Sequence, residues 1–278
     1  MDTHELSLFS GLTPSEEADV RKHGWRRAVE RGAFIVHQGD PATSIFYLDE
    51  GRAKLSQVTP DGQEVAFRYL GAGDTFGAIA ITPGAIYPVS VEAVEDCQVL
   101  AWDRDTIQKL LAKNARLGLN LTTILTTMVR QLQDQVRELA TERAERRIAR
   151  ALTRLARQMG RRVENGILID MPLSRQDLAE LTGTTLYTVS RVLSQWEQQG
   201  IVESGRERIL LRIPTASSSS PTTLARPTKS NSEQNILAFS GNKQGGRGRP
   251  LCLRLRKELW LSILYASLKG DMHGPHND

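Results

Sequence analysis

Glycine-containing turns divide the first third of the chain into short apolar runs, and this pattern constrains the fold more than any other feature. The runs at residues 33–36 and 45–48, for example, are too short for buried helices, and each is followed by a turn that contains glycine. Short apolar runs that alternate with turns at spacings of about ten residues are typical of antiparallel β structure. We therefore predict a compact antiparallel β-roll over residues 1–110.

The hydrophobic period changes to a helical one in residues 111–140. Apolar side chains recur there at steps of three and four residues, at Leu121, Leu125, Met128, Leu132, Val136 and Leu139. A narrow apolar seam of this kind predicts a long helix that pairs with a second helix. The alternative is a helix that packs on its own domain, but the polar residues around the seam favour a partner. We expect a homodimer.

Residues 141–213 begin with an amphipathic helix and continue into two short helices joined by a tight turn. Ser174 and Asp177 have the spacing of a capping box at the start of the first short helix. Gly183 supplies the backbone freedom that the turn needs. The second short helix is expected to bury Val189, Val192, Leu193 and Trp196. This pattern, followed by a two-stranded wing at 201–213, predicts a winged helix-turn-helix whose second helix enters the major groove of DNA.

The outward face of this second helix carries the side chains that would contact DNA. Arg191 can donate two hydrogen bonds to a guanine edge, and Ser190 can bond a neighbouring base. Side chains and free N–H groups at the starts of both short helices suit phosphate groups. The candidate DNA-binding residues are Ser174, Arg175, Gln176, Thr185, Tyr187, Thr188, Ser190 and Arg191.

The charge distribution agrees with a polyanionic partner for the second half of the chain only. Residues 1–110 carry a net charge of −7 and residues 141–213 one of +4. The amphipathic helix after residue 140 has a basic face composed of Arg143, Arg146, Arg147, Arg150, Arg154 and Arg157. A solvated surface explains that basic face as well as a ligand contact does.

Other features of the sequence exclude several classes of protein. No stretch reaches the roughly 20 apolar residues that span a bilayer, and no signal-peptide pattern is present, so we expect a cytoplasmic protein without a membrane contact. Cys97 and Cys252 give no basis for a disulfide framework or a metal site. No hydrolase, P-loop or metal-enzyme motif occurs, so we predict no catalytic residues and no enzyme. Residues 214–278 are of low complexity, and we predict a disordered tail.

Several motifs resemble the CRP/FNR superfamily of bacterial regulators, over roughly residues 6–213. They are Gln38-Gly39-Asp40, Tyr47-Leu48-Asp49-Glu50-Gly51, Gly71-Ala72-Gly73-Asp74-Thr75-Phe76-Gly77 and Thr188-Val189-Ser190-Arg191. The resemblance implies an α+β fold: a cyclic-nucleotide-binding-like β-roll, a long dimerisation helix and a C-terminal winged helix-turn-helix. It also implies a symmetric dimer on a palindromic site in double-stranded DNA, and contact with RNA polymerase.

The same resemblance places an effector pocket around Phe76, Gly77, Ala78, Ile79 and Tyr87. In the cyclic-nucleotide-binding members, a glutamate contacts the ribose and an arginine pairs with the cyclic phosphate. Here Ala78 and Tyr87 stand at those positions, and no lysine or arginine occurs between Arg68 and Arg104. Because burial of an unpaired phosphate charge is costly, we expect that this roll does not bind cyclic AMP.

The effector stays unknown at this point. The iron–sulfur branch of the family is disfavoured, because its N-terminal cysteine cluster is absent. Residues 184–191 and 87–90 look most like the nitrogen-oxide-responsive branch, which makes a haem one candidate cofactor. The candidate axial ligands in the roll would be His4, His23 and His37. Tyr187 replaces the acidic residue typical of both main branches, so the base pair that it faces is open.

The main alternative function is a regulatory β-roll that controls a protein partner, such as an enzyme or a channel, rather than DNA. The helix-turn-helix and its wing argue against this alternative. Salt-dependent binding to duplex DNA would distinguish the two.

Overall fold

The structure, a computed structural model, describes residues 7–205 and 208–212. The chain divides into two units, Met1–Ile213 and Pro214–Asp278, and all the described residues belong to the first unit. His4 and the predicted low-complexity tail therefore lie outside the described residues. Among the residues that are described, no helix is both long enough and apolar enough to cross a membrane.

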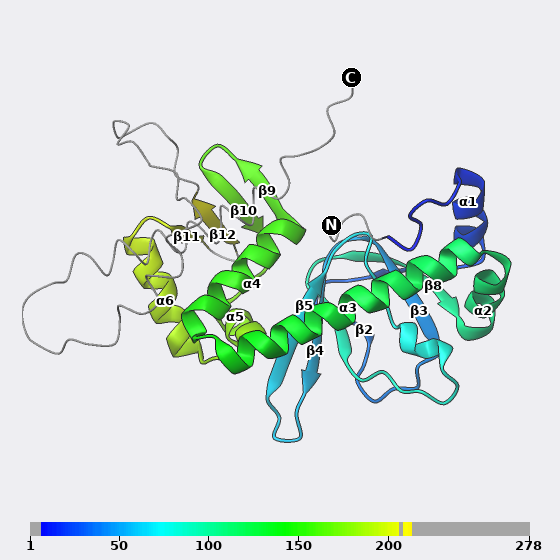
Figure 1. Ribbon diagram of the computed structural model, residues 1–278, viewed down its shortest axis with the longest axis horizontal. Coiled ribbons are helices and arrows are strands. Elements are labelled where there is room, and N and C mark those ends of the chain that lie inside the picture. Colours follow the sequence, from blue (N-terminus) through cyan, green and yellow to red (C-terminus); the bar gives the residue numbers. More distant parts are fainter. Residues whose placement is uncertain (1–6, 206–207, 213–278) are drawn as a thin grey trace, which may run out of the picture. The chain divides into compact units, whose positions relative to one another are not determined.

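The N-terminal part of the first unit is an antiparallel β-roll built from two sheets (Figure 1). Its strands in the described part of the chain are β1 (Trp25–Val29), β2 (Phe34–Val36), β3 (Ser44–Glu50), β4 (Ala53–Val58), β5 (Glu64–Leu70), β6 (Thr75–Phe76), β7 (Ser90–Ala93) and β8 (Cys97–Asp103). One sheet has the order β1-β8-β3-β6 and the other β2-β7-β4-β5, with all neighbours antiparallel. Strands β3 and β8 lie inside the first sheet, and their nearly continuous apolar runs are buried on both faces. The α+β class and the predicted roll are confirmed.

Short helical segments complete the roll. They are α1 (Pro14–Lys22), the 3₁₀ segment η2 (Ala78–Ile81) and α2 (Arg104–Lys113). Thr13 caps the start of α1: its side chain accepts a hydrogen bond from the Glu16 amide, and the Glu16 carboxylate accepts one from the Thr13 amide. The carbonyl of Val20 accepts a hydrogen bond from the indole of the fully buried Trp102, 2.9 Å away. This buried bond fixes the end of α1 to β8.

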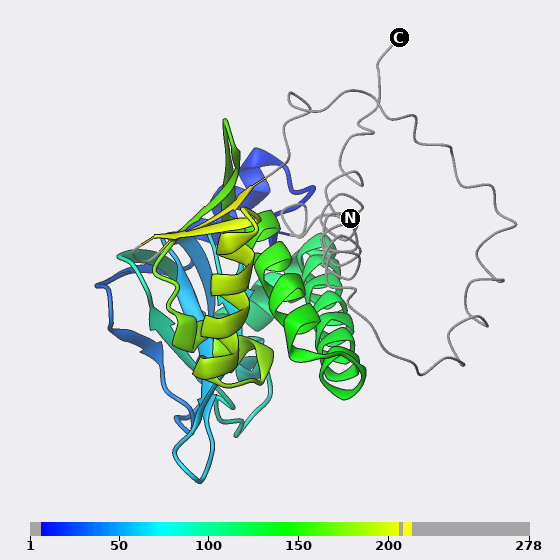
Figure 2. The same cartoon turned by 90° about the vertical axis from the view of Figure 1, so that its left-hand side faces the viewer.

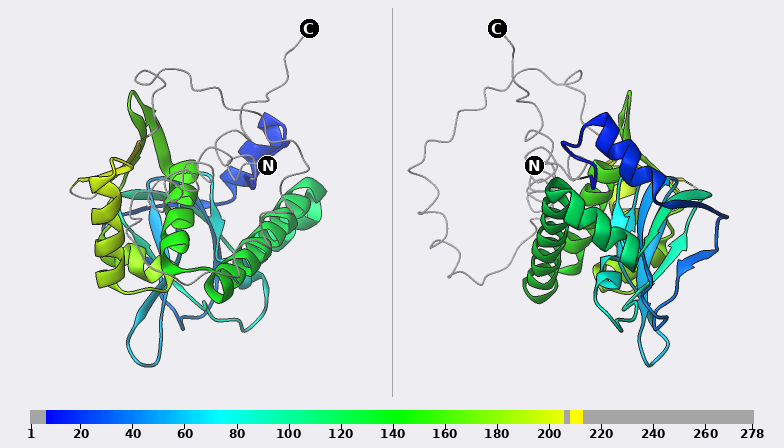
Figure 3. Two further views of the ribbon diagram at one scale, coloured as in Figure 1. Left: turned by 60° about the vertical axis from the view of Figure 1, so that its left-hand side comes forward. Right: turned by 90° about the vertical axis from the view of Figure 1, so that its right-hand side faces the viewer.

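The long helix α3 (Ala115–Thr141) follows α2, and side chains of its first turns pack into the core of the roll (Figures 1 and 3). Leu117 and Leu121 are buried in the core of the roll. Leu121 therefore belongs to this core and not to the predicted seam. The large apolar side chains left exposed further along α3 are Leu125, Val129, Leu132, Val136 and Leu139. These positions step by four, three, four and three residues, which is a regular heptad pattern.

The C-terminal part of the unit is a helical module with a four-stranded sheet of order β11-β12-β10-β9 (Figure 2). Its elements are α4 (Ala144–Met159), β9 (Gly160–Val163), β10 (Gly166–Asp170), α5 (Arg175–Thr182), α6 (Leu186–Gln198), β11 (Val202–Gly205) and β12 (Arg208–Arg212). The predicted helix pair and two-stranded wing are present. The β9–β10 hairpin was not predicted, although Asn165-Gly166, where the turn enters β10, is a strong hairpin signal.

Ion pairs join α3 to α4 where one helix ends and the next begins. The carboxylate of Glu138 is almost fully buried and accepts a 2.8 Å hydrogen bond from Arg154. Arg150 donates to the carboxylate of Glu142, 2.9 Å away. Arg147 donates to the carbonyl of Thr182, 2.8 Å away, at the end of α5. Three arginines of the predicted basic face are thus engaged in holding the helices together.

A second contact holds α5 against strand β5 of the roll. The ammonium nitrogen of Lys54 lies 2.9 Å from the carboxylate of Glu64, 3.7 Å from that of Glu92 and 3.8 Å from that of Asp177 in α5. Lys54 is only 8% exposed, so its charge is largely removed from water. Tyr69 is almost fully buried and close enough to Asp177 to feel its charge. Because buried charges need such partners, electrostatics and burial together fix α5 to the roll.

The pKa values of the groups at this contact reflect their burial and their partners. Burial lowers the pKa of Lys54, but its hydrogen bond to Glu64 and the neighbouring carboxylates more than offset this, and the net pKa is raised above 10.5. Burial, assisted by the charge of Asp177, raises the pKa of Tyr69 above its usual 10.0. For the two glutamates near this contact, burial and hydrogen bonding shift the pKa in opposite directions. Burial raises the pKa of Glu64 but hydrogen bonds reverse this to a net lowering, whereas burial raises the pKa of Glu180.

We expect the free energy of unfolding to decline above about pH 10 through Lys54 and Tyr69. A group whose pKa is raised on folding contributes its stabilisation fully below its unfolded pKa and loses it as the pH rises. Urea unfolding at about pH 8 and about pH 11 should show a smaller decline for a Lys54→Met/Tyr69→Phe variant than for the wild type. Tyr187→Phe, a change at an exposed tyrosine, serves as the control and should keep the wild-type decline. Equal declines in the wild type and the double variant would contradict the expectation.

Candidate nucleic-acid interface

Helices α5 and α6 are joined by the tight turn that the sequence predicts. The Ser174 side chain accepts a hydrogen bond from the Asp177 amide, and the Asp177 carboxylate accepts one from the Ser174 amide. Gly183 ends α5 with a φ of 56°, a left-handed conformation that glycine adopts without strain. Thr185 caps α6 by accepting a hydrogen bond from the amide of Thr188. The capping side chains therefore define both helix starts.

The buried face of α6 determines which of its side chains point outward. All four predicted core residues, Val189, Val192, Leu193 and Trp196, are buried. The opposite face presents Tyr187, which is 76% exposed, and Arg191 one turn later. Arg191 forms no hydrogen bond or ion pair with another described residue. Its guanidinium group is therefore available to a ligand.

Hydroxyl groups and one further apolar residue surround Arg191 and Tyr187. The hydroxyls of Thr185 and Thr188 lie 3.0 Å apart, and Ser190 is half-buried next to Arg191. Leu186 is also exposed, although it is not among the predicted DNA-binding residues. It lies three residues before the buried Val189, so periodicity alone suggests an inward position, but the described residues leave it 48% exposed.

The candidate residues at the start of α5 form a separate group. The guanidinium of Arg175 lies 3.7 Å from the carboxylate of Glu197, near the end of α6. Gln176 donates a 3.0 Å hydrogen bond to Glu180. Glu197 is about 15 Å along the helix axis from Tyr187. The eight candidate residues thus form two groups, one at each end of α6.

The wing follows α6 as an antiparallel pair, β11 and β12. Arg212 donates a 2.6 Å hydrogen bond to Glu203 across the pair, and Arg208 is exposed. Residues 206–207, between β11 and β12 in the sequence, lie outside the described residues. The wing therefore adds an exposed cation beside the helix pair.

Aromatic side chains fill the part of the roll where the effector pocket was predicted. Phe76 is buried and stacks on Phe46, with ring centroids 5.2 Å apart. The hydroxyl of the buried Tyr87 donates to the carbonyl of Ser44 at 2.7 Å and accepts from the Ser44 amide at 3.0 Å. Gly77 lies so close to Ser44 that a Cβ there would be 2.9 Å from the carbonyl oxygen. Of the other two predicted residues, Ala78 is partly buried against the core and Ile79 is exposed.

The two arginines that flank this part of the sequence already have partners. Arg104 donates to the carbonyls of Ala80, Ala42 and Thr82, at 2.6, 3.0 and 3.2 Å. Arg68 donates a 2.7 Å hydrogen bond to Asp74, which neutralises its charge, while its buried Nε has no partner among the described residues. Both guanidinium groups therefore serve mainly to hold the roll together.

The two described candidate haem ligands lie at the surface of the roll. The ring of His23 is about half exposed, and its Nδ1 lies 2.7 Å from the carbonyl oxygen of Asp19. His37 is exposed and stacks on Phe34. Within the described ranges, no group of three or more His, Cys, Asp or Glu side chains could hold a metal ion. These two positions do not suit a haem enclosed in an apolar pocket.

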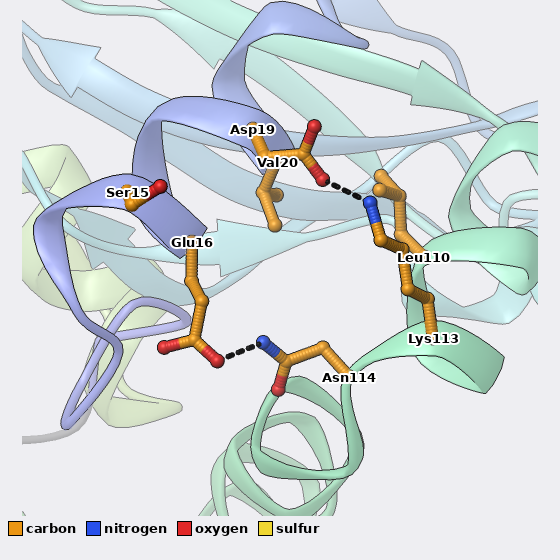
Figure 4. Close-up of a pocket in the computed structure, with 7 residues that line it drawn as sticks. All are labelled: Ser15, Glu16, Asp19, Val20, Leu110, Lys113 and Asn114. Atoms are coloured by element: carbon orange, nitrogen blue, oxygen red, sulfur yellow. Dashed lines mark hydrogen bonds and ion pairs between the residues drawn. The ribbon is translucent and has the colours of Figure 1, made fainter.

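A hollow of about 350 Å³ lies elsewhere, between α1 and the junction of α2 with α3 (Figure 4). Lys113 donates to Asp19 at 2.8 Å, and Asn114 donates to Glu16 at 3.1 Å, across this hollow (Figure 4). These bonds use the polar groups that a ligand would need. The hollow lies between α1 and the start of α3, and none of the predicted effector residues lines it.

Two family models match this chain, one for each part of the described unit. A cyclic nucleotide-binding domain matches residues 26–114, and a Crp-like helix-turn-helix domain matches residues 146–216. The first covers most of the roll, and the second covers the helix pair with its wing. The order of the two domains agrees with that expected from the sequence motifs.

Whole proteins with the same architecture are also similar to this chain. The Cyclic AMP receptor protein of Thermus thermophilus is 30% identical over 74% of this chain and 92% of its own length. The Global nitrogen regulator of Synechococcus elongatus is 29% identical over 67% of this chain and 85% of its own. The structure of FixK2 from Bradyrhizobium japonicum, 26% identical, matches with a TM-score of 0.61 over 68% of this chain and 93% of that one. The chain belongs to the CRP/FNR superfamily of DNA-binding transcription regulators, which are not enzymes.

Proposed function

We propose that this regulator acts as a homodimer on a palindromic DNA site, with α6 of each protomer in the major groove. The observation that supports this most is the outward face of α6, where Arg191 has no partner among the described residues and lies beside hydroxyl groups. Arginine on such a face makes the commonest specific contact in DNA recognition, a bidentate bond to guanine. We further propose that the protein works in the cytoplasm, beside the chromosome, and contacts RNA polymerase, as expected for its family.

The exposed heptad of α3 supports the dimer. Five large apolar side chains, from Leu125 to Leu139, face solvent in the single chain. A second copy of α3 would cover them, and each burial is worth roughly 1.5–3 kcal/mol. A symmetric dimer would also present two copies of α6 related by a two-fold axis, the symmetry of a palindromic site.

We propose that the roll responds to a signal other than cyclic AMP, although several relatives are named for that ligand. The proposal is supported by the side chains in the predicted pocket. Tyr87 occupies the place where the family's arginine is expected, and its hydroxyl is hydrogen-bonded to the backbone of Ser44. Arg68 and Arg104 are the flanking cations, and both are engaged by groups of the roll. The positions of the described histidines do not favour haem, so the signal's identity is left open.

The alternative function, a roll that regulates a protein partner, does not require that the protein bind DNA. The Crp-like helix-turn-helix domain over residues 146–216 argues for DNA instead. Titration with duplex DNA at several salt concentrations separates the two, because phosphate contacts make binding fall steeply with salt.

Replacing Leu125 and Leu132 by lysine should give a monomer that binds DNA weakly. Two charges on each seam would repel in the dimer and would have to be desolvated. Sedimentation equilibrium measures the state directly. Val58→Lys, at an equally exposed apolar residue outside the seam, is the matched control and should stay dimeric. A double variant that still sediments as a dimer would exclude α3 as the interface.

Cyclic AMP should cause no stabilisation of the purified protein at millimolar concentration. A ligand that binds only the folded state raises the free energy of unfolding by about 2.7 kcal/mol at a hundredfold excess over its Kd. Thermal unfolding with and without the nucleotide therefore detects even a micromolar site. Stabilisation by cyclic AMP would contradict the proposal, and its loss in Arg68→Met would then place the phosphate at the spare donor of Arg68.

Arg191→Ala should abolish the preference for the specific site over random DNA and leave weak, salt-sensitive binding. An arginine–guanine contact is worth about 1–3 kcal/mol of discrimination in each half-site. Arg175→Ala is the comparison variant. It should weaken binding to both kinds of DNA alike and flatten the salt dependence, as the loss of a phosphate contact does. If Arg191→Ala reduces both affinities by one factor, Arg191 contacts phosphate and the proposed placement of α6 is wrong.

A further inference from the structure

Leu186 and Tyr187 begin α6 with two large apolar side chains in solvent, 48% and 76% exposed. Single exposed apolar residues are common on protein surfaces, so exposure alone carries no conclusion. Here, however, Tyr187 lies on the same outward face as the unpaired Arg191, because residues four apart are neighbours on a helix surface. The two side chains would therefore enter a DNA groove together.

The remaining chemistry of this face restricts which bases it can select. Carboxylates accept from cytosine, and the amides of Asn and Gln pair with adenine. The only acidic residue in α6 is Glu197, which faces Arg175 near the end of the helix. Neither a carboxylate nor a carboxamide occurs in residues 186–193. Over these first two turns of α6, the face offers one guanidinium, several hydroxyls and an apolar surface.

The thymine C5-methyl is the apolar group that base edges present in the major groove. We propose that Tyr187, with Leu186 beside it, contacts a thymine methyl group in each half-site, close to the guanine contacted by Arg191. This proposal rests on the DNA-binding function proposed above and adds the base that the first turn of α6 selects. Tyr187 and Arg191 lie about 6 Å apart along the helix axis, and base pairs are about 3.4 Å apart, which puts thymine within about two base pairs of guanine.

The experiment begins with selection of the preferred site by the full-length protein from randomised duplexes. Each thymine of that site is then replaced by deoxyuridine, which lacks the methyl group and keeps every hydrogen-bonding atom. Loss of the contacted methyl group in one half-site should weaken wild-type binding by about fourfold, the value of burying one methyl group. Loss of it in both half-sites should weaken binding by about fifteenfold.

Two variants at position 187 assign the effect to the aromatic ring. Tyr187→Ala should bind the thymine and deoxyuridine duplexes equally, whereas Tyr187→Phe should keep the wild-type difference. Because Tyr187 makes few contacts within the protein, both variants are expected to fold, which circular dichroism verifies. Trp25→Ala, at an exposed aromatic residue of β1, is the control and should discriminate like the wild type.

The outcomes separate this proposal from the general function. If the wild type selects a site but binds thymine and deoxyuridine equally, no methyl contact exists and the proposal is overturned. It is also overturned if Tyr187→Ala still discriminates, or if Tyr187→Phe does not, since the phenol oxygen would then make the contact. If the wild type selects no sequence at all, the proposed DNA-binding function fails, and this inference fails with it.

Discussion

The buried carboxylate of Glu138 fixes the direction in which the chain leaves the long helix α3, and the C-terminal module depends on it. A carboxylate that is 5% exposed is stable only with charged partners, and Arg154 of α4 supplies the closest one. The position of α4 is thereby tied to α3. Helices α5 and α6 pack on α4, and Arg147 adds hydrogen bonds to the turn between them. The position of α6, and so the direction of its outward face, thus depends on the ion pair between Glu138 and Arg154.

A second charged contact links the same module to the roll. Lys54 is buried among carboxylates of the roll and Asp177 of α5, while that same Asp177 caps α5. One side chain therefore serves both the local start of a helix and the contact between two domains. Removal of one member of a buried charged group leaves the others unpaired, which is more costly than loss of the bond itself. Because Lys54 and Asp177 form a direct ion pair, a change in the roll that moved Lys54 would also act on α5, the first helix of the helix-turn-helix.

Periodicity and turn chemistry made much of the fold predictable. The roll, the capping box of Ser174 and Asp177, Gly183 and the buried face of α6 all follow from local patterns, and the structure has them. Local patterns could not show that Leu121 packs into the roll, because an apolar residue at that spacing suits either partner. They also could not distinguish arginines that bind carboxylates from arginines that face a ligand. That distinction depends on Glu138 and Glu142, which lie at the end of α3. Their carboxylates come next to arginines of α4 only after folding.

Arg191 of α6 differs from Arg68 and Arg104, the two arginines that flank the predicted effector pocket, in having no partner among the described residues. On α6, Arg191 has no partner among the described residues, so an anionic ligand gains a charge contact without breaking one. In the roll, Arg68 is neutralised by Asp74, and Arg104 holds three carbonyl groups. An anionic signal would have to compete with Asp74 or leave those carbonyls unpaired, and each costs free energy. An anionic ligand that reached this part of the roll would therefore have to displace an existing partner, whereas one that reached Arg191 would not.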